Sequence, residues 1–503
     1  MHFNLKINPA KDELSFKKDS ALVKFFIESK KIEKTLDDFF LSLNFPLGKI
    51  QKKNFLDKKS NEFTYYSQTG EPSVLFIKKV KIDKDFSVDF FRNYFAGLVP
   101  SLKKKNLNSV HVVVPSFFDF KDHFENESQL IRSMLEGIHL GNYTFDNYKT
   151  DKEKPVEISF FIHYTDQKIL NSEIDYSNKL MSAVFFARDL VNEPAITLTP
   201  EELANRTKKE LTKLGVKVTS FDKAELKKRK MNGILAVGAA SDKSPYLITM
   251  HYKPLGKAKR KVALVGKGVC YDTGGLSIKP TSGMLEMKAD MAGGGAVVGI
   301  IKAAAMMKLP VEIIGVIPAV ENMIGGSSYK PGDIVKAASG KTIEVKDTDA
   351  EGRIVLADAL HYASQQKPDE IIDFATLTGA VVVALGEIAA GLFTNDDRLA
   401  DELLQSGKTT HERLWRLPFW RDYNEMIKSD IADVSNLGPR WGGAITAGKF
   451  LENFVDEKIP WAHLDIAGPA IKHKLNNYTE KFDTGFGVRL MIEYLSKIEF
   501  AYC

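Results

Sequence analysis

Val345-Lys346-Asp347-Thr348-Asp349-Ala350-Glu351-Gly352-Arg353 decides how the rest of this chain is interpreted. Its acidic side chains, at 347, 349 and 351, lie close to an arginine, and only small residues separate them. The segment that follows, 354–360, has the apolar spacing of a helix. The acids therefore precede a helix start, where backbone N–H groups and the helix dipole favour anions. Two interpretations remain open here: carboxylates that a cation neutralises, or a capped helix end with a surface ion pair.

A second stretch, 261–299, favours the cation. Its first residues predict a short buried strand that ends at Lys267, between two glycines. Asp272 follows within a glycine-rich loop, and Lys279 and Asp290 come farther along the chain. Lysines and acids thus stand where strands give way to loops, and parallel α/β sheets bind their ligands at such positions.

Together the two stretches resemble the signatures of the leucyl (cytosol) aminopeptidase family, whose members are exopeptidases with two metal ions. The family's hallmark, Asn-Thr-Asp-Ala-Glu-Gly-Arg, is matched here except at Asp347, where the family has Asn. Further similarity covers 188–195, 373–380 and 461–470, in the same order and spacing. The resemblance extends over roughly the C-terminal two-thirds of the chain, and the N-terminal third contributes little to it.

The resemblance implies a ligand set for two divalent metal ions. One ion would be held by Asp272, Asp349 and Glu351, together with the main-chain carbonyl of Asp349. The other would be held by Lys267, Asp272, Asp290 and Glu351. Four carboxylates and two divalent cations balance in charge only when both ions are present. Such oxygen-rich ligands admit Zn²⁺ or Mn²⁺, and also Co²⁺ or Mg²⁺.

The resemblance also implies how the side chains act on a peptide. A water between two metals roughly 3.5–4 Å apart would be the nucleophile. Lys267 would ligate as a neutral amine, so the cation must lower its pKa from about 10.4. Lys279 would stay charged and polarise the scissile carbonyl, and Arg353 would hold a bicarbonate ion as general base. The substrate cleft would be lined by Met287, Thr376, Leu377 and Gly379.

Three departures from the family pattern stand beside the site. Asp347 replaces Asn and adds a negative charge, Thr273 replaces the usual Ser, and glycines at 294–295 replace a usual pair of alanines. None of them removes a ligand. The departures bear on metal preference and pH optimum, and they leave the reaction class unchanged.

The whole chain has the composition of a globular protein with an ample core. It has 503 residues, of which 44% are hydrophobic and 27% charged, with a formal net charge of +5. This mild excess of positive charge does not by itself imply a nucleic-acid partner. Two cysteines suit a reducing compartment. The N-terminus lacks the apolar run of a signal peptide, and no apolar stretch approaches the roughly 20 residues of a membrane span. A cytoplasmic protein is expected, with no membrane partner.

The predicted fold class is α/β, with a small N-terminal α/β domain and a larger C-terminal α/β/α catalytic domain whose sheet is mixed and largely parallel. The expected limits are 1–165 for the first domain, of macro-like type, 166–194 for a linker helix and 195–503 for the catalytic domain. In the first domain we expect strands at 73–77, 110–114 and 157–162, and helices at 86–102 and 127–140. In the catalytic domain strands are expected at 216–219, 234–238, 246–252, 261–267, 311–318, 370–375, 388–393 and 461–466. Helices are expected there at 200–214, 290–307, 353–366, 397–406, 443–456 and 486–497.

The predicted function is metal-dependent removal of the N-terminal residue, leucine or another hydrophobic one, from peptides by a homohexamer. Two alternatives on the same fold are a DNA-binding regulator and a catalytically silent binding protein. The intact ligand set disfavours the second, and the N-terminal domain has no basic–aromatic strip that supports the first. An aspartic-protease dyad of Asp272 and Asp483, each within Asp-Thr-Gly, is disfavoured because that fold is all-β. His463 is expected to be a core histidine or one that lies behind the metal ligands, and Cys270 is expected to be a packing residue.

Overall fold

The computed structural model describes the chain except for residues 1–4, 11–18, 58–59, 68–70, 152–156 and 499–503. It divides into two compact units, one of residues 1–181 with 476–478 and one of residues 182–475 with 479–503. The division falls inside α5 (Gln167–Asn192), a long helix that the sequence predicts over 169–191. The domain limits expected from the sequence remain a prediction.

The N-terminal unit is built on a six-stranded sheet in the order β1-β6-β5-β2-β4-β3. All pairings are parallel except that of β3 with β4. Its strands are β1 (Leu5–Pro9), β2 (Ser20–Ile27), β3 (Glu62–Tyr66), β4 (Val74–Val80), β5 (Ser109–Val113) and β6 (Ile158–His163). Its helices are α1 (Ile32–Ser42), α2 (Lys49–Leu56), α3 (Phe90–Lys104) and α4 (Glu127–Asn142), with a 3-10 turn η1 (Phe117–Asp119). The alternating strands and helices that the sequence predicts here are therefore present, and four further elements in 20–66 were missed.

Phenylalanine side chains form much of the core of this unit. The Phe25 ring on β2 meets Phe91 and Phe95 on α3 edge-on, with centroid distances of 5.1 and 5.9 Å. Such pairs add to the stabilisation that burial of each ring already provides. The Phe-rich composition of the N-terminal third thus has a packing role.

The C-terminal unit contains a nine-stranded sheet in the order β16-β15-β18-β14-β9-β11-β8-β7, with β10 paired to β11. The central pairs β11–β9, β9–β14 and β14–β18 are parallel, and β7, β8 and β15 introduce antiparallel pairs. The mixed, largely parallel sheet predicted from the sequence is confirmed. Its strands are β7 (Lys217–Phe221), β8 (Tyr246–Tyr252), β9 (Lys261–Gly266), β10 (Gly268–Asp272), β11 (Glu312–Asn322), β14 (Glu370–Ala375), β15 (Ala390–Thr394), β16 (Leu414–Arg416) and β18 (Trp461–Asp465). A separate small sheet is formed by β12 (Ile334–Lys336), β13 (Thr342–Glu344) and β17 (Val434–Ser435).

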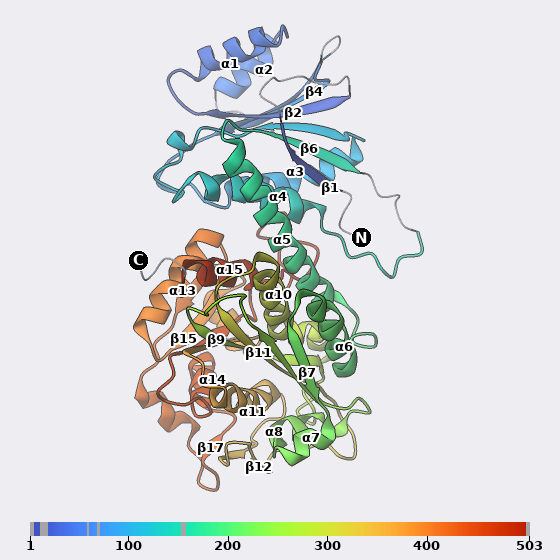
Figure 1. Ribbon diagram of the computed structural model, residues 1–503, viewed down its shortest axis with the longest axis vertical. Helices are drawn as coiled ribbons and strands as arrows, with labels where there is room; N and C mark the ends of the chain where they lie inside the picture. Colours follow the sequence, from blue (N-terminus) through green and yellow to red (C-terminus); the bar gives the residue numbers. More distant parts are fainter. Residues whose placement is uncertain (1–4, 11–18, 58–59, 68–70, 152–156, 499–503) are drawn as a thin grey trace. The chain divides into compact units, whose positions relative to one another are not determined.

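Helices cover both faces of the large sheet. Its α-helices are α6 (Pro200–Leu211), α7 (Lys223–Lys228), α8 (Asn232–Val237), α9 (Thr281–Met284), α10 (Ala292–Met307), α11 (Glu351–Gln365), α12 (Gly379–Leu385), α13 (Asp397–Thr410), α14 (Gly443–Glu452) and α15 (Val488–Lys497). The 3-10 turns are η2 (Thr212–Leu214), η3 (Gly238–Ala240), η4 (Met287–Met291) and η5 (Arg421–Ile427). Figure 1 shows α6, α10, α13 and α15 on one face of the sheet and α8, α11 and α14 on the other.

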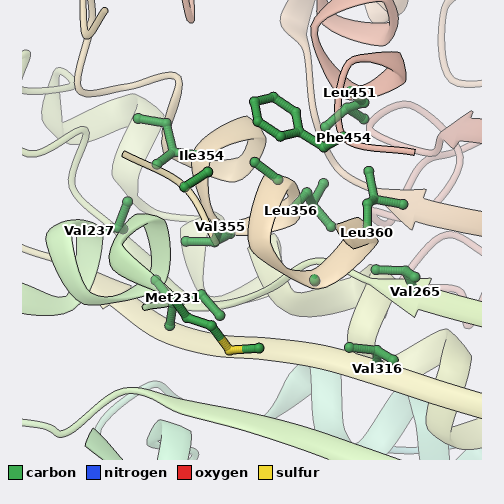
Figure 2. Close-up of a cluster of buried hydrophobic side chains, with 14 of the residues drawn as sticks. Met231, Val237, Val265, Val316, Ile354, Val355, Leu356, Leu360, Leu451 and Phe454 are labelled. Carbon is green, nitrogen blue, oxygen red and sulfur yellow. The ribbon is translucent and has the colours of Figure 1, made fainter. Parts of the chain in front are cut away.

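Helix α11 fixes the position of the acidic loop that precedes it. Figure 2 shows Ile354, Val355 and Leu356 of α11 among buried side chains from the sheet, Val265 and Val316. The apolar residues that predict this helix from the sequence are all fully buried. Large-to-small substitutions in such a cluster typically cost about 2–5 kcal/mol, so the first turn of α11 is held rigidly against the sheet.

The strand predicted over 234–238 is wrong, because this segment is helix α8. Its short apolar run could not be distinguished from a buried helix by periodicity alone. A distant carboxyl group pairs the start of this helix: Asp358 accepts a hydrogen bond from the backbone N–H of Ile234, in the first turn of α8, at 3.1 Å. The bond satisfies one of the N–H groups that a helix start leaves without an intrahelical partner.

One helical segment, Met287–Met307, is long and apolar enough to be considered as a membrane span, which the sequence-based search for apolar runs did not predict. Of its apolar window, 89% is buried inside the protein. Core helices of globular domains share this length and composition, and the segment packs against β9, β11 and β14 as such a helix does.

Candidate metal centre

The predicted ligands come together at the carboxyl ends of neighbouring strands. Lys267 lies between the end of β9 and the start of β10, and Asp272 is the last residue of β10. Asp290 belongs to the η4 turn that leads into α10, and Glu351 is the first residue of α11. The order of the strands thus brings into one site Lys267 and Glu351, which are 84 positions apart in the sequence.

Three buried carboxylates form the centre of the site. Asp272, Asp290 and Glu351 each offer an oxygen that lies within 4.8 Å of the others, and none of the three is more than 5% exposed. Lys267 contacts two of them, with its Nζ 2.7 Å from Asp290 and 2.8 Å from Glu351. The arrangement therefore has an ammonium group enclosed on one side by carboxylates.

The second lysine and the remaining acid lie at the more exposed side of this cluster. Lys279 Nζ is 2.9 Å from Asp272 Oδ2 and also forms an ion pair with Asp349. The side chain of Asp349 is 34% exposed, in contrast to the three central carboxylates. All five predicted metal ligands and Lys279 are thus joined in one network of contacts.

The crowding of these acids disfavours their charged forms. Burial raises the pKa of Asp290 well above its usual range. Lys267 acts in the opposite direction, but the neighbouring carboxylates of Glu351 and Asp272 raise this pKa further. Burial and repulsion from Asp272 raise the pKa of Glu351, and burial raises that of Asp349 to about 7. A cation added to the cluster would reverse these shifts.

The two lysines are held in their charged forms by the acids around them. Burial opposes the charge of Lys267, but Asp290 and Glu351 outweigh it and raise its pKa above the usual range. Burial also opposes the charge of Lys279, and the negative charge of Asp272 is the main cause that raises its pKa above the usual range. Ligation by a neutral Lys267 would therefore require the cation itself to lower this pKa.

Two unpaired oxygens show that the ligand set fits a metal ion. Asp290 Oδ2 and Glu351 Oε2 are buried and have no hydrogen-bond partner within the described part of the chain. A buried carboxylate oxygen without a partner is costly. Both belong to the cluster around Lys267, and carboxylate oxygens with an amine nitrogen are suitable donors for Zn²⁺, Mn²⁺ or Mg²⁺.

The start of α11 lies against the Lys267 side chain, and a glycine at position 352 leaves room for it. A Cβ atom on Gly352 would lie 2.5 Å from Cε of Lys267. At Gly293, in the first turn of α10, a Cβ would lie 2.0 Å from the carbonyl oxygen of Phe374 on β14. Helix starts therefore pack directly on the strand ends, which confines the lysine between them.

The predicted cleft residues differ in how closely they contact this centre. Thr376 donates its hydroxyl to Asp290 Oδ1 at 2.7 Å and accepts at its carbonyl from Lys267 at 3.1 Å. The backbone N–H of Leu377 donates to the buried carboxylate of Asp465 at 3.1 Å. The other two predicted residues are Gly379, which begins α12, and half-buried Met287, which begins η4.

Arg353 is buried, and most N–H groups of its guanidinium make no hydrogen bond with the described residues. Its Nη1 donates to the carbonyl oxygen of Asn436, and no ion pair to Arg353 is present among the residues that the structure describes. Burial lowers its pKa to about 10, although Asp465, Glu351 and Asp347 act in the opposite direction. The group therefore remains a cation at neutral pH, with N–H donors left for a small anion.

Two buried asparagines that the sequence analysis missed brace the acidic loop. Asn322 donates its side-chain amide to Asp272 Oδ1 at 2.8 Å and to the carbonyl of Thr348 at 3.0 Å. Asn436 accepts from the N–H of Lys346 at 2.8 Å and donates to the carbonyl of Asp347 at 2.6 Å. Asn322 ends the apolar run of β11, as Asp272 ends β10, which is a signal that sequence reasoning could have used. The sequence around Asn436 offers none.

The residues predicted to be structural lie in the core. His463 is fully buried on β18, with Nδ1 2.6 Å from Asp373. Cys270 is also buried, and burial raises the pKa of its thiol. Asp483 accepts from the N–H of Lys472 at 3.1 Å and lies outside the carboxylate cluster that contains Asp272. No hydrogen bond joins Asp272 to Asp483 within the described ranges, and this geometry gives no support to a proton-sharing dyad.

Comparison with known proteins identifies similar chains. The model of the cytosol aminopeptidase family, catalytic domain, matches residues 185–492. A probable cytosol aminopeptidase of Chloroherpeton thalassium is 44% identical over 425 residues, covering 81% of this chain and 83% of the relative. One of Aquifex aeolicus is 43% identical over 434 residues and covers 85% of both chains.

Solved structures of similar fold extend over nearly the whole chain. A mutant tomato leucine aminopeptidase matches with a TM-score of 0.86 and 33% identity, covering 98% of this chain and 96% of that one. The bottromycin maturation enzyme BotP in complex with Mn matches with a TM-score of 0.82 and 31% identity, covering 95% and 99%. The α/β fold is thus shared with known proteins over nearly the whole chain.

Proposed function

Because this chain belongs to the cytosol aminopeptidase family, we propose that it removes the N-terminal residue, leucine or another hydrophobic one, from peptides with two divalent metal ions. Membership of this family indicates a peptidase. One observation supports a metal-dependent mechanism most directly. Buried oxygens of Asp290 and Glu351 lack partners in the described chain, beside a lysine that contacts both residues. A centre with such donors is suited to cations.

The proposed metal ligands are the buried cluster and its two neighbours. One ion would be held by Asp272, Asp349 and Glu351, and the other by Lys267, Asp272, Asp290 and Glu351. Zn²⁺ and Mn²⁺ are the preferred candidates, and the Mn complex of BotP supports the second. When bound, the ions would lower the pKa of the attacking water and polarise the peptide carbonyl.

The basic side chains would act on the substrate and on the proton balance. Lys279, 18% exposed at the outer side of the cluster, would donate to the peptide carbonyl oxygen as negative charge develops there. Arg353 would hold a bicarbonate ion through the N–H groups that Asn436 leaves free. Held there, bicarbonate would supply a general base beside the metal site, and the described contacts of the cluster include no histidine that could take this role.

Residues 376–379 would form one wall of the cleft for the first substrate residue. Thr378 donates its hydroxyl to Asp465 at 2.7 Å and caps α12, so this segment is rigid. Met287 would contribute an apolar surface to the same pocket. Exposed apolar side chains nearby in the sequence, Ile278 and Leu285, suit a hydrophobic first residue.

Location in the cytosol and assembly into a homohexamer are also part of the proposal. The relatives named as probable cytosol aminopeptidases support the first. Three tryptophans of the C-terminal unit are 64–73% exposed, and large exposed apolar groups are typical of association surfaces. They are Trp415, Trp420 and Trp441. Light scattering on the purified protein would give the number of subunits.

The test is hydrolysis of a panel of aminoacyl amides by chelator-stripped protein to which single metals are returned. Activity should disappear with the chelator, return with Mn²⁺ or Zn²⁺, and be highest for leucyl and other hydrophobic amides. Glu351→Gln should abolish it, whereas Glu344→Gln, a change outside the cluster, should not. Hydrolysis that persists without metal would contradict the proposed function.

A further inference from the structure

We infer that Asn322 is a positioning residue of the metal centre, whose side-chain amide sets the orientation of Asp272 and its distance from the loop that carries Asp349. The inference rests on the proposed function, because Asp272 is assigned there as a ligand of both ions. Asn322 itself would contact neither metal nor substrate. It would act through the carboxylate and the carbonyl that it holds.

The contacts of Asn322 join the two ligand segments. Its Nδ2 donates to Asp272 Oδ1 at 2.8 Å and to the carbonyl oxygen of Thr348 at 3.0 Å. The main-chain carbonyl oxygen of Asn322 accepts hydrogen bonds from the N–H and the hydroxyl of Thr273, at 3.0 and 2.9 Å. Since β10 and β11 are parallel and place Asp272 opposite Asn322, strand pairing fixes the amide beside the carboxylate.

The hydrogen bond to Asp272 directs one of its oxygens. Oδ1 receives the Asn322 amide and also the N–H of Gly274, at 2.8 Å each. Oδ2 is thereby turned to the side of the cluster where Lys279 lies, 2.9 Å away. The amide is neutral, so it orients the carboxylate without cancelling the negative charge that a cation needs.

The side-chain carbonyl oxygen of Asn322 is left unpaired by the residues that the structure describes, although the nitrogen of the same amide donates two hydrogen bonds. Asn322 is fully buried, and its Oδ1 has no hydrogen-bond partner among the described residues. Leaving such an oxygen unpaired typically costs about 1–3 kcal/mol. A leucine of similar shape would avoid this cost, so packing alone gives no reason for an amide at this position.

Tyr329 provides a matched control, because it shares only one of the two partners. Its hydroxyl donates to the same carbonyl of Thr348 at 2.7 Å and forms no hydrogen bond with Asp272. Tyr329→Phe therefore removes a tether of the acidic loop alone. Asn322→Leu and Asn322→Ala remove that tether and the bond to Asp272 together, so the difference between the variants reports on Asp272.

The experiment measures Mn²⁺ affinity of the chelator-stripped full-length protein by titration calorimetry, with thermal unfolding recorded for each variant. We expect Asn322→Leu and Asn322→Ala to weaken Mn²⁺ binding by about 10–100-fold, as loss of groups that orient metal ligands commonly does. Tyr329→Phe should weaken it by less than about threefold. Asn322→Ala removes the amide and leaves a cavity, whereas Asn322→Leu fills the same space with a branched apolar side chain. The alanine variant is used for the measurement if the leucine variant does not fold.

Three outcomes would overturn the inference, and they are distinguishable. Wild-type affinity in folded Asn322→Leu or Asn322→Ala would overturn it while leaving the proposed function standing. An equal loss in Tyr329→Phe would assign the effect to the loop tether and not to Asp272. Absence of Mn²⁺ or Zn²⁺ binding by the wild-type protein would overturn the proposed function, and this inference with it.

Discussion

The main-chain carbonyl of Asn436 accepts a hydrogen bond from Nη1 of Arg353, although the two residues are 83 positions apart in the sequence. The side chain of Asn436 pairs at the same time with the backbone on both sides of the peptide between Lys346 and Asp347. The arginine and the acidic loop therefore share one anchor. Any change in the loop that moves this anchor would also move the guanidinium.

The two lysines should respond differently to replacement. Lys267→Met should lower metal affinity, and a higher metal concentration should partly restore the rate, because this buried side chain contacts two proposed ligands. Lys279→Met should retain metal and lower kcat by about 10²–10³, the usual cost of losing one donor to a developing oxyanion. Metal analysis and steady-state kinetics on both variants check this. Equal metal loss in the two variants would contradict the division of roles.

Asp347→Asn should leave the loop intact and shift the onset of activity to lower pH. Asp347 Oδ1 accepts from the N–H of Asp349 at 2.8 Å, and an asparagine oxygen can accept the same bond. The variant therefore removes only a charge, and the attacking water loses its proton more readily beside a less negative site. The pH–rate profile measures this, with Asp347→Ala as the variant that loses the hydrogen bond as well. A profile identical to that of the wild type would show that this charge does not act on the site.

Asp483→Asn should raise the free energy of unfolding at pH 7.5 and much less at pH 4.5. Burial raises the pKa of Asp483 to about 6, above the value of about 3.9 in an unfolded chain. The folded protein thus keeps a proton that the unfolded chain releases, and stability falls as pH rises from about 4 to about 6. The asparagine keeps the acceptor for Lys472 and avoids a buried charge, a gain on the order of 1–3 kcal/mol.

Urea unfolding at the two pH values tests this prediction for Asp483. Asp401→Asn, on the exposed side of α13, is the matched control and should change stability by less than about 0.5 kcal/mol at either pH. A stability gain for Asp483→Asn that is the same at both pH values would argue against titration of this group.

Glycines in the first turns of α10 should differ sharply in their tolerance of alanine. Gly293→Ala would force a methyl group against the carbonyl of Phe374 and should lower the free energy of unfolding by about 3 kcal/mol or more. In Gly295→Ala the one tight contact of the new Cβ is with a methyl of Val191 at 3.0 Å, its other near neighbours lying at 3.5 Å or more. A better helix propensity, worth up to about 1 kcal/mol, offsets this contact. Thermal and urea unfolding compare the two. Equal destabilisation would show that the packing of this turn is uniformly tight.

Sequence patterns predicted the elements whose signals are local. The apolar run that ends at Lys267 and the helical spacing after Glu351 correspond to β9 and α11, because burial on the sheet requires these patterns. The positions of the predicted ligands at strand and helix ends follow from the same pattern.

Long-range contacts account for what the sequence could not predict. The first turn of α8 is paired with a carboxyl group 124 residues away, through the bond from Ile234 to Asp358. The side chain of Asn436 holds the acidic loop through bonds that span 90 positions to Lys346 and 89 positions to Asp347. Such partners are chosen by the fold and leave no periodic trace in the chain, so a short apolar run or a single asparagine remains ambiguous until the sheet is assembled.

The contact between Gly352 and Lys267 determines where directed evolution of this protein can succeed. In a library that varies position 352, every other residue would displace the end of the Lys267 side chain, because its Cβ atom would lie 2.5 Å from Cε of that lysine. Position 347, whose side chain is half-buried at the edge of the site, accepts substitutions without this collision. Selection for a new metal preference would therefore reach useful variants by randomising 347 while the glycine codon is kept fixed.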